Sequence, residues 1–167
     1  EASTRTLSHW LLGSPHDYLR DYALDLHQLI QFIQSTQPTL VEALDLAHDS
    51  PTRRKFLTRL REQITQHGTI HILRHGIKHE KYDIMLYYPS ASVLNPQAME
   101  RYLANRFSIT RQLRYSSDTT RRALDLALFI NGLPIFSFEL KNNLTCQTTT
   151  DAIRQYQQDR DPKELLF

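Results

Sequence analysis

The sequence predicts an α/β or α+β domain in which helices come first and a mixed, largely antiparallel sheet follows. Three observations predict this class. Apolar residues recur at helical spacing over 22–38 and 50–68, whereas β-branched and aromatic residues concentrate at 81–89 and 107–116. Two further apolar runs meet at Asn131-Gly132, a pair that is typical of a hairpin turn.

The first half of the chain carries marked helix boundaries. One helix is expected to stop before Pro38, and a shorter helix is expected over 40–47. The next helix has Ser50 as its N-cap, Pro51 at its first position and Gly68 just past its end.

The second half alternates strands with helices. A helix over 95–106 separates the two strand-like segments, and another over 148–160 follows the hairpin. We therefore expect one compact domain, with an N-terminal helical part at 1–76 and a core sheet with its following helix at 77–167.

Composition sets the broad class of the protein. The 167 residues are 40% hydrophobic with a net charge of +2, which is globular and only mildly basic. Cys146 is the only cysteine, so we expect no internal disulfide and a reducing, cytoplasmic compartment. The uncharged apolar stretch 126–138 is too short to span a membrane, so no membrane partner is expected. The chain begins with Glu1 and ends at Phe167, and we expect it to be a fragment of a larger polypeptide.

Four histidines, at 67, 71, 75 and 79, recur every four residues. Two histidines at that spacing on a helix can share a zinc ion. Two glycines interrupt the segment and the lone cysteine is distant in sequence, so the pattern favours surface or helix-end histidines over a metal site.

Charged residues interrupt both apolar runs of the hairpin. Asp125 lies in the first run, and Glu139 and Lys141 lie in the second, where their spacing of two places them on one face of a strand. A carboxylate withdrawn from water needs a cation, a metal or strong hydrogen bonds. Two such residues in adjacent strands indicate a shared cause.

The parity of the turn decides whether the two carboxylates meet. If an odd-numbered loop pairs Ile130 with Pro134, Asp125 falls opposite Glu139 on one face, whereas a plain two-residue loop separates them. We therefore predict a three- or five-residue loop, or a bulge, at 131–134.

Two adjacent carboxylates favour a divalent cation, and Mg²⁺ prefers oxygen ligands and keeps waters that can attack a phosphodiester. A lysine can orient that water and neutralise charge on the transition state. The spacing alone is not specific, because Asp161-Pro162-Lys163 repeats it after a helix. The alternative interpretation is an exposed ion pair of Glu139 and Lys141 on an edge strand.

Asp125, followed fourteen residues later by Glu139-x-Lys141, resembles the PD-(D/E)xK nuclease motif. More specifically, the run from 124 to 162, "LDLALFINGLPIFSFELKNNLTCQTTTDAIRQYQQDRDP", is similar to the nuclease segment of the R subunit of Type I restriction-modification enzymes. The similarity extends upstream through "RFSITRQLRYS" and "FIQSTQP", so it covers most of the chain.

The resemblance implies a restriction-endonuclease-like core and a Mg²⁺-dependent endonuclease domain that cleaves double-stranded DNA. In this family an ATP-driven translocase follows in the same subunit, which assembles with modification and specificity subunits. ATP would bind only in that translocase. By the family pattern, Asp125, Glu139 and the Leu140 carbonyl would hold the metal, and Lys141 would assist the attacking water.

The chain departs from the family pattern at two points. Leu124 precedes Asp125 where the motif's name has proline, and Ala152 stands where many members carry a glutamine four residues before Tyr156. Gln155 lies beside that tyrosine instead. Arg154, Gln155 and Tyr156 are candidate DNA-binding residues, although Tyr156 also fits a core position.

Two other functions stay open at this point. One is a different PD-(D/E)xK enzyme, such as a repair or junction nuclease. The other is a catalytically silent DNA-binding or subunit-docking module, against which the three charged residues argue, because buried charges are costly to keep.

Overall fold

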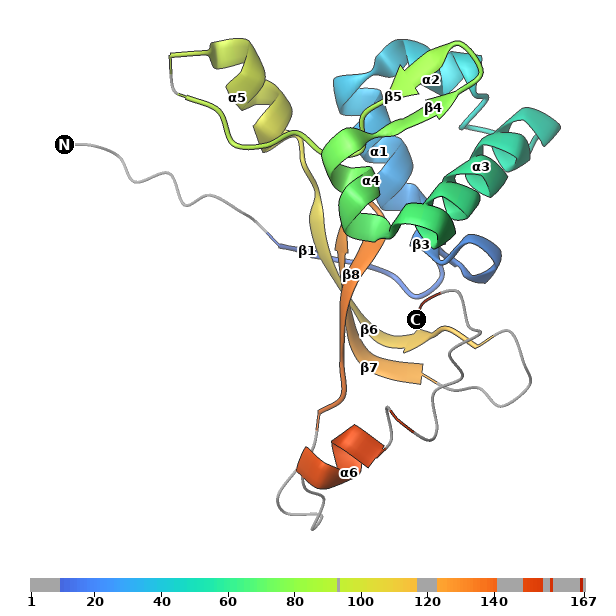
Figure 1. Ribbon diagram of the computed structural model, residues 1–167, viewed down its shortest axis with the longest axis vertical. Coiled ribbons are helices and arrows are strands. Elements are labelled where there is room, and N and C mark those ends of the chain that lie inside the picture. The colour runs from blue at the N-terminus through green and yellow to red at the C-terminus, as the bar shows by residue number, and fades with distance from the viewer. Residues whose placement is uncertain are drawn as a thin grey trace.

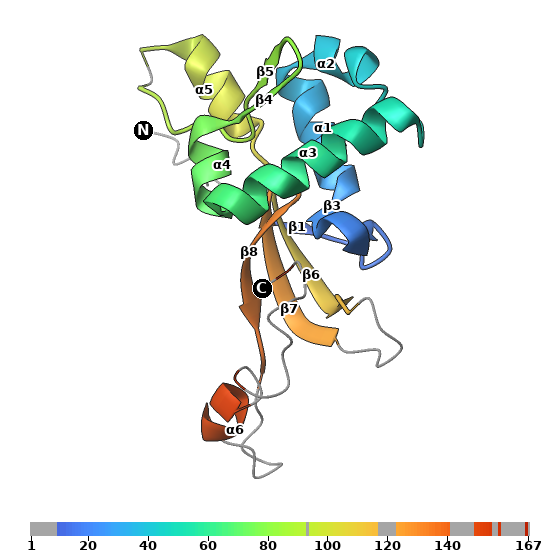
Figure 2. The ribbon, with the colours of Figure 1, turned by 45° about the vertical axis from the view of Figure 1, so that its right-hand side comes forward.

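The structure is a computed structural model that describes residues 10–92, 94–116, 123–140, 149–154, 157 and 166. The helices between residues 26 and 103 gather at one end of a sheet whose other end extends toward the helix at 149–154 (Figure 1). The turned view shows the same arrangement, with α3 crossing above the strands (Figure 2). The elements in chain order are β1 (Leu11–Leu12), β2 (Tyr18–Leu19), the 3-10 helix η1 (Arg20–Tyr22), β3 (Leu24–Asp25), α1 (Leu26–Thr36), α2 (Pro38–Ala43), α3 (Pro51–His67), α4 (Thr69–His75), β4 (Ile77–His79), β5 (Tyr82–Ile84), α5 (Pro96–Leu103), β6 (Phe107–Arg114), β7 (Ala123–Ile130), β8 (Leu133–Phe138) and α6 (Thr149–Arg154).

The main sheet has the strand order β1-β6-β7-β8. β1 runs parallel to β6, and the β6–β7 and β7–β8 pairs are antiparallel. The prediction of a mixed, largely antiparallel sheet with helices is therefore confirmed. The predicted division into parts at 1–76 and 77–167 stays a prediction. β1, from the first part, pairs with β6, from the second.

The helix boundaries follow the capping signals of the sequence. Ser50 accepts a hydrogen bond from the Arg53 N–H at 3.2 Å and caps α3, whose C-cap is Gly68 with a φ of 83°. Pro51 occupies the first turn, as predicted. Asn95 caps α5 in the same way by accepting from the Ala98 N–H.

Several details differ from the sequence prediction. The first helix begins only at Leu26, because the preceding residues form β2, η1 and β3, and Asp25 caps it by accepting from the Gln28 N–H at 3.0 Å. Pro38 starts α2, which ends at Ala43. The predicted strand at 81–89 is reduced to β5, which pairs with β4 in a separate hairpin.

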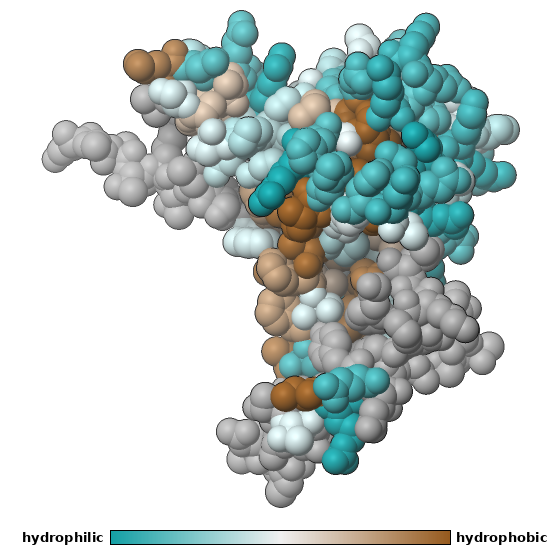
Figure 3. Space-filling model, in the orientation of Figure 1, coloured by the Kyte–Doolittle hydropathy of each residue, from teal (hydrophilic) through white to brown (hydrophobic). Residues whose placement is uncertain are grey.

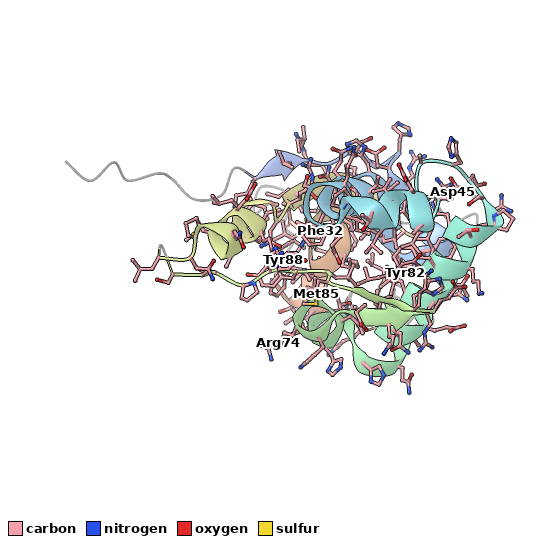
Figure 4. All side chains as sticks on the ribbon, turned by 90° about the horizontal axis from the view of Figure 1, so that it is seen from above. Phe32, Asp45, Arg74, Tyr82, Met85 and Tyr88 are labelled. Atoms are coloured by element: carbon pink, nitrogen blue, oxygen red, sulfur yellow. The ribbon has the colours of Figure 1, made fainter. Side chains whose placement is uncertain are left out.

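The larger hydrophobic core lies among α1, α3, α4 and the β4–β5 hairpin. Phe32 and Phe56 are among its fully buried side chains. Phe32 and Tyr88 lie close together in the view from above, with ring centroids 6.0 Å apart (Figure 4). The side-chain amide of Gln37 both donates to the Met85 carbonyl at 2.8 Å and accepts from the Met85 N–H at 3.0 Å, which ties α1 to the segment after β5.

A second buried cluster lies on the sheet itself. Tyr18 packs edge-on against Phe129, with ring centroids 6.1 Å apart. Leu113, Leu124 and Ala127 complete the same cluster from β6 and β7. This contact joins the N-terminal segment to the strands that carry the candidate site.

Candidate functional site

The β7–β8 hairpin combines a two-residue turn with a bulge. Ile130 pairs with Leu133 across Asn131-Gly132, and the register shifts between Leu128 and Phe129. Beyond the shift, Leu126 pairs with Phe138. The predicted pairing of Ile130 with Pro134 is therefore wrong, because the turn is shorter. A bulge is present, but it lies at Ile135, just beyond the predicted segment 131–134.

The bulge brings the two carboxylate residues into line. The pair that follows Leu126 and Phe138 along the ladder is Asp125 and Glu139, so both lie on one face of the sheet. The Leu140 N–H donates to Oδ2 of Asp125 at 2.7 Å, which continues the contact between the strands past the end of β8. Without the bulge, Asp125 would lie opposite Phe138 instead.

The nearly continuous apolar run at 124–130 favours a strand that is covered on both faces, but Asp125 in this run is only half-buried, as is Glu139. The physical reason is their position in the part of the sheet that extends beyond α1–α5 (Figure 1). Partial exposure lowers the cost of keeping a carboxylate ionised and leaves room for a ligand.

Gln112 is a site residue that the sequence analysis did not identify. It lies between the pairs Arg111–Leu126 and Leu113–Leu124, directly across from Asp125, and its Nε2 donates to Oδ1 of Asp125 at 3.2 Å. Its φ is 50°, in the left-handed region, although it lies inside β6. Glutamine gives no sequence signal for such a conformation, whereas glycine or asparagine would have.

A comparison with protein-family models decides the family. The model described as "Type I restriction enzyme R protein N terminus" matches residues 25–167, most of the chain. The chain belongs to this family. No curated protein and no solved structure matches it.

Membership of the Type I restriction enzyme R family gives the carboxylate pair a functional context, because the family implies a restriction endonuclease role. The matched region includes β6, β7 and β8 and therefore all three residues of the Gln112, Asp125 and Glu139 group. The role of each residue is a separate question from the family assignment.

The donor set at this site fits a hard divalent cation. Carboxylate and carbonyl oxygens are the ligands that Mg²⁺ prefers, and Mg²⁺ commonly uses one or two carboxylates with several waters. Each oxygen of Asp125 already accepts one hydrogen bond, from Gln112 or from Leu140, and each has a second lone pair available for a metal.

Four further predicted site residues come after β8 in the sequence. Lys141, Gln155 and Tyr156 lie outside the described residues. Arg154 is the last residue of α6 and is exposed. The prediction that it contacts DNA stays a prediction.

The repeating histidines lie apart from the hairpin. The rings of His67, His71 and His75 form an exposed stack, with centroid distances of 5.1 and 4.2 Å, whereas His79 is buried beside Phe56. Within the described ranges, no group of three or more His, Cys, Asp or Glu side chains is arranged to hold a metal. The same part of the chain contains no helix with the length and apolar character that crossing a membrane requires.

Proposed function

We propose that this domain is a Mg²⁺-dependent endonuclease that cleaves phosphodiester bonds of double-stranded DNA, as the nuclease part of a Type I restriction enzyme R subunit. The observation that carries the proposal is the alignment of Asp125 and Glu139 across the β7–β8 ladder, next to the Leu140 backbone. Two carboxylates on the same face of adjacent strands repel each other, so such a pair destabilises the sheet unless it binds a cation.

Asp125, Glu139 and the carbonyl of Leu140 would hold the metal. In an extended segment the N–H and C=O of one residue point toward the same neighbouring strand. Since the Leu140 N–H reaches Asp125, its carbonyl is well placed for the same side. When bound, Mg²⁺ supplies a Lewis acid for the phosphate oxygens and lowers the pKa of a bound water.

Lys141 follows two residues after Glu139, so on an extended chain it would project to the same face. Its ammonium would orient the attacking water and offset the negative charge that develops on the phosphate. Asp125 and Glu139 are half-buried, and electrostatic interactions near half-buried groups are stronger than in bulk water.

Arg154, Gln155 and Tyr156 would contact the DNA, with Arg154 at a phosphate. We propose that the domain reads no sequence itself and that the modification and specificity subunits supply the target. ATP would act only in the translocase part of the same subunit. These assignments extend the family assignment to the partners.

Metal titration tests the proposal directly. Calorimetry with Mn²⁺ should show binding to the unaltered chain, and Asp125→Asn and Glu139→Gln should abolish it. Asp83→Asn and Glu100→Gln are matched controls because both side chains are exposed and lie on other elements, β5 and α5. Equal Mn²⁺ binding in all five proteins would overturn the proposal.

Cleavage by the complete restriction complex gives the second test. Asp125→Asn, Glu139→Gln and Lys141→Met should each reduce DNA cleavage by roughly 100-fold or more. The ATPase rate should stay unchanged, because these residues lie outside the motor. DNA binding without cleavage or metal binding would favour a silent docking module, and cleavage of branched DNA by this chain alone would favour a repair or junction nuclease.

A further inference from the structure

The buried face of strands β6 and β7 switches to the opposite face at Gln112 and Asp125. Residues two apart in a regular strand share a face, so a change of parity marks a break in the strand. The buried residues of β6 are Ser108, Thr110 and then Leu113, and those of β7 are Leu124, then Ala127 and Phe129. In both strands the change falls at Gln112 and Asp125, the position that the β6–β7 ladder skips between Arg111–Leu126 and Leu113–Leu124.

The left-handed backbone of Gln112 accounts for this break. A φ of 50° is costly for a residue that has a Cβ, and it persists only where surrounding contacts hold it. Local irregularities of this kind re-aim side chains and are common next to active sites. Here the irregularity directs the Gln112 amide toward the carboxylate across the ladder.

Gln112 and the Leu140 N–H hold the two oxygens of Asp125 from opposite sides. Gln112 Nε2 donates to Oδ1 from β6 at 3.2 Å, and the Leu140 N–H donates to Oδ2 at 2.7 Å from beyond β8. Two donors on neighbouring strands restrict the rotation of the carboxylate more than either donor alone. The plane of the Asp125 carboxylate is therefore set before any ligand arrives.

We propose that Gln112 is a positioning residue for the metal site: its side-chain amide orients Asp125 so that the carboxylate faces Glu139. This inference rests on the proposed function. Gln112 acts through Asp125 and not on the substrate. Outer partners that fix a ligating carboxylate commonly change metal affinity by about 10- to 100-fold.

The first test needs no metal. Gln112→Met keeps the length of the side chain and removes the donor, so Asp125 should rotate more freely and the Leu140 amide should exchange its hydrogen faster with solvent. Gln97→Met makes the same change at an exposed position on α5 and should leave Leu140 unaffected. Unchanged Leu140 exchange in Gln112→Met would overturn the positioning role whatever the metal does.

The second test measures Mn²⁺ binding by calorimetry. Gln112→Met should weaken it by roughly 10- to 100-fold, with the thermal midpoint of unfolding unchanged, and saturating Mn²⁺ should restore cleavage by the complete complex. Gln112→Gly, which relieves the left-handed backbone, should weaken binding equally, because the amide and not the backbone is responsible.

The two proposals fail in different ways. Full Mn²⁺ affinity in Gln112→Met, or in Gln112→Gly alone, overturns the role of the Gln112 side chain while leaving the nuclease proposal intact. Metal binding that does not depend on Asp125 overturns the nuclease proposal, and Leu140 exchange then still shows whether Gln112 orients the Asp125 carboxylate.

Discussion

The side-chain amide of Asn131 donates a hydrogen bond to Oδ1 of Asn105 at 2.9 Å, inside the protein. Asn131 is fully buried although it occupies the hairpin turn, because the turn points into the helical part. It also donates to the Leu86 carbonyl at 2.8 Å and accepts from the Arg106 N–H at 2.7 Å. One turn residue therefore ties the hairpin to two separate segments, the one after β5 and the one just before β6.

Asn131→Ala should destabilise the protein by roughly 3–5 kcal/mol, because it removes three side-chain hydrogen bonds, two of them buried, including those to the Leu86 carbonyl and from the Arg106 N–H. Urea denaturation measures this loss. Asn95→Ala removes only an exposed helix cap and should cost about 1 kcal/mol. Similar losses for the two variants would show that the Asn131 network contributes little.

Gly132→Ala should cost several kcal/mol, because the new Cβ would collide with the Asp25 carbonyl and lie 2.8 Å from the Leu29 backbone nitrogen. Gly68→Ala is the matched control: its φ of 83° is nearly the same as the 82° of Gly132, but nothing lies within 4 Å of the added atom. The difference between the losses of unfolding free energy in Gly132→Ala and Gly68→Ala gives the cost of the steric collision. A difference of zero would mean that the turn can move away from α1.

Asp25→Asn should stabilise the protein at neutral pH. Asp25 is 1% exposed, and burial raises the pKa of its carboxyl above the ordinary 3.8. Its Oδ1 caps α1, whereas Oδ2 is buried without a hydrogen-bond partner in the described part of the chain. Asparagine keeps the capping oxygen and removes the charge.

The sign of the pH dependence follows from this raised pKa. The protonated carboxyl favours the folded state, so its contribution is fully present below pH 3.8 and is lost as the pH rises through the higher pKa of the folded protein. The gain from Asp25→Asn should therefore shrink on acidification, as measured by urea denaturation between neutral and acid pH. A gain independent of pH would contradict the burial argument. The exposed Asp83→Asn variant controls for the loss of one negative charge.

His75→Gln should raise the pKa of His71. Desolvation is the main cause that lowers the pKa of His71, and the neighbouring His75 and His67 lower it further. The His71–His75 ring distance is 4.2 Å and the His67–His71 distance is 5.1 Å. His75→Gln should therefore raise the pKa of His71 more than His67→Gln does. NMR titration of the His71 ring measures both, and equal shifts would contradict the dependence on distance.

The exposed edge of the sheet carries an apolar strip along β8. Phe136, Phe138 and Leu140 are exposed, and Figure 3 shows hydrophobic side chains gathered along the course of this strand. The strip faces away from Asp125 and Glu139, since neighbouring residues of a strand alternate between faces. The charged and apolar faces of one strand are thus separated.

The sequence by itself determined the helix caps, the Asn-Gly turn and the condition under which the two carboxylates can meet. Ser50, Pro51 and Gly68 act through contacts within a few residues, so their effects can be read locally. The parity argument also succeeded, because side chains alternate along a strand and only a bulge or an odd loop could align Asp125 with Glu139.

Only the tertiary structure decided the depth of Asn131 and the role of Gln112. Asn131 looks like an ordinary turn residue until the segment after β5 and the residues just before β6 bond to its side chain. Gln112 adopts a left-handed backbone that its residue type does not favour, held by contacts across the sheet. Both depend on residues distant in sequence, and a local pattern cannot encode the free energy of contacts that exist only after the strands have paired.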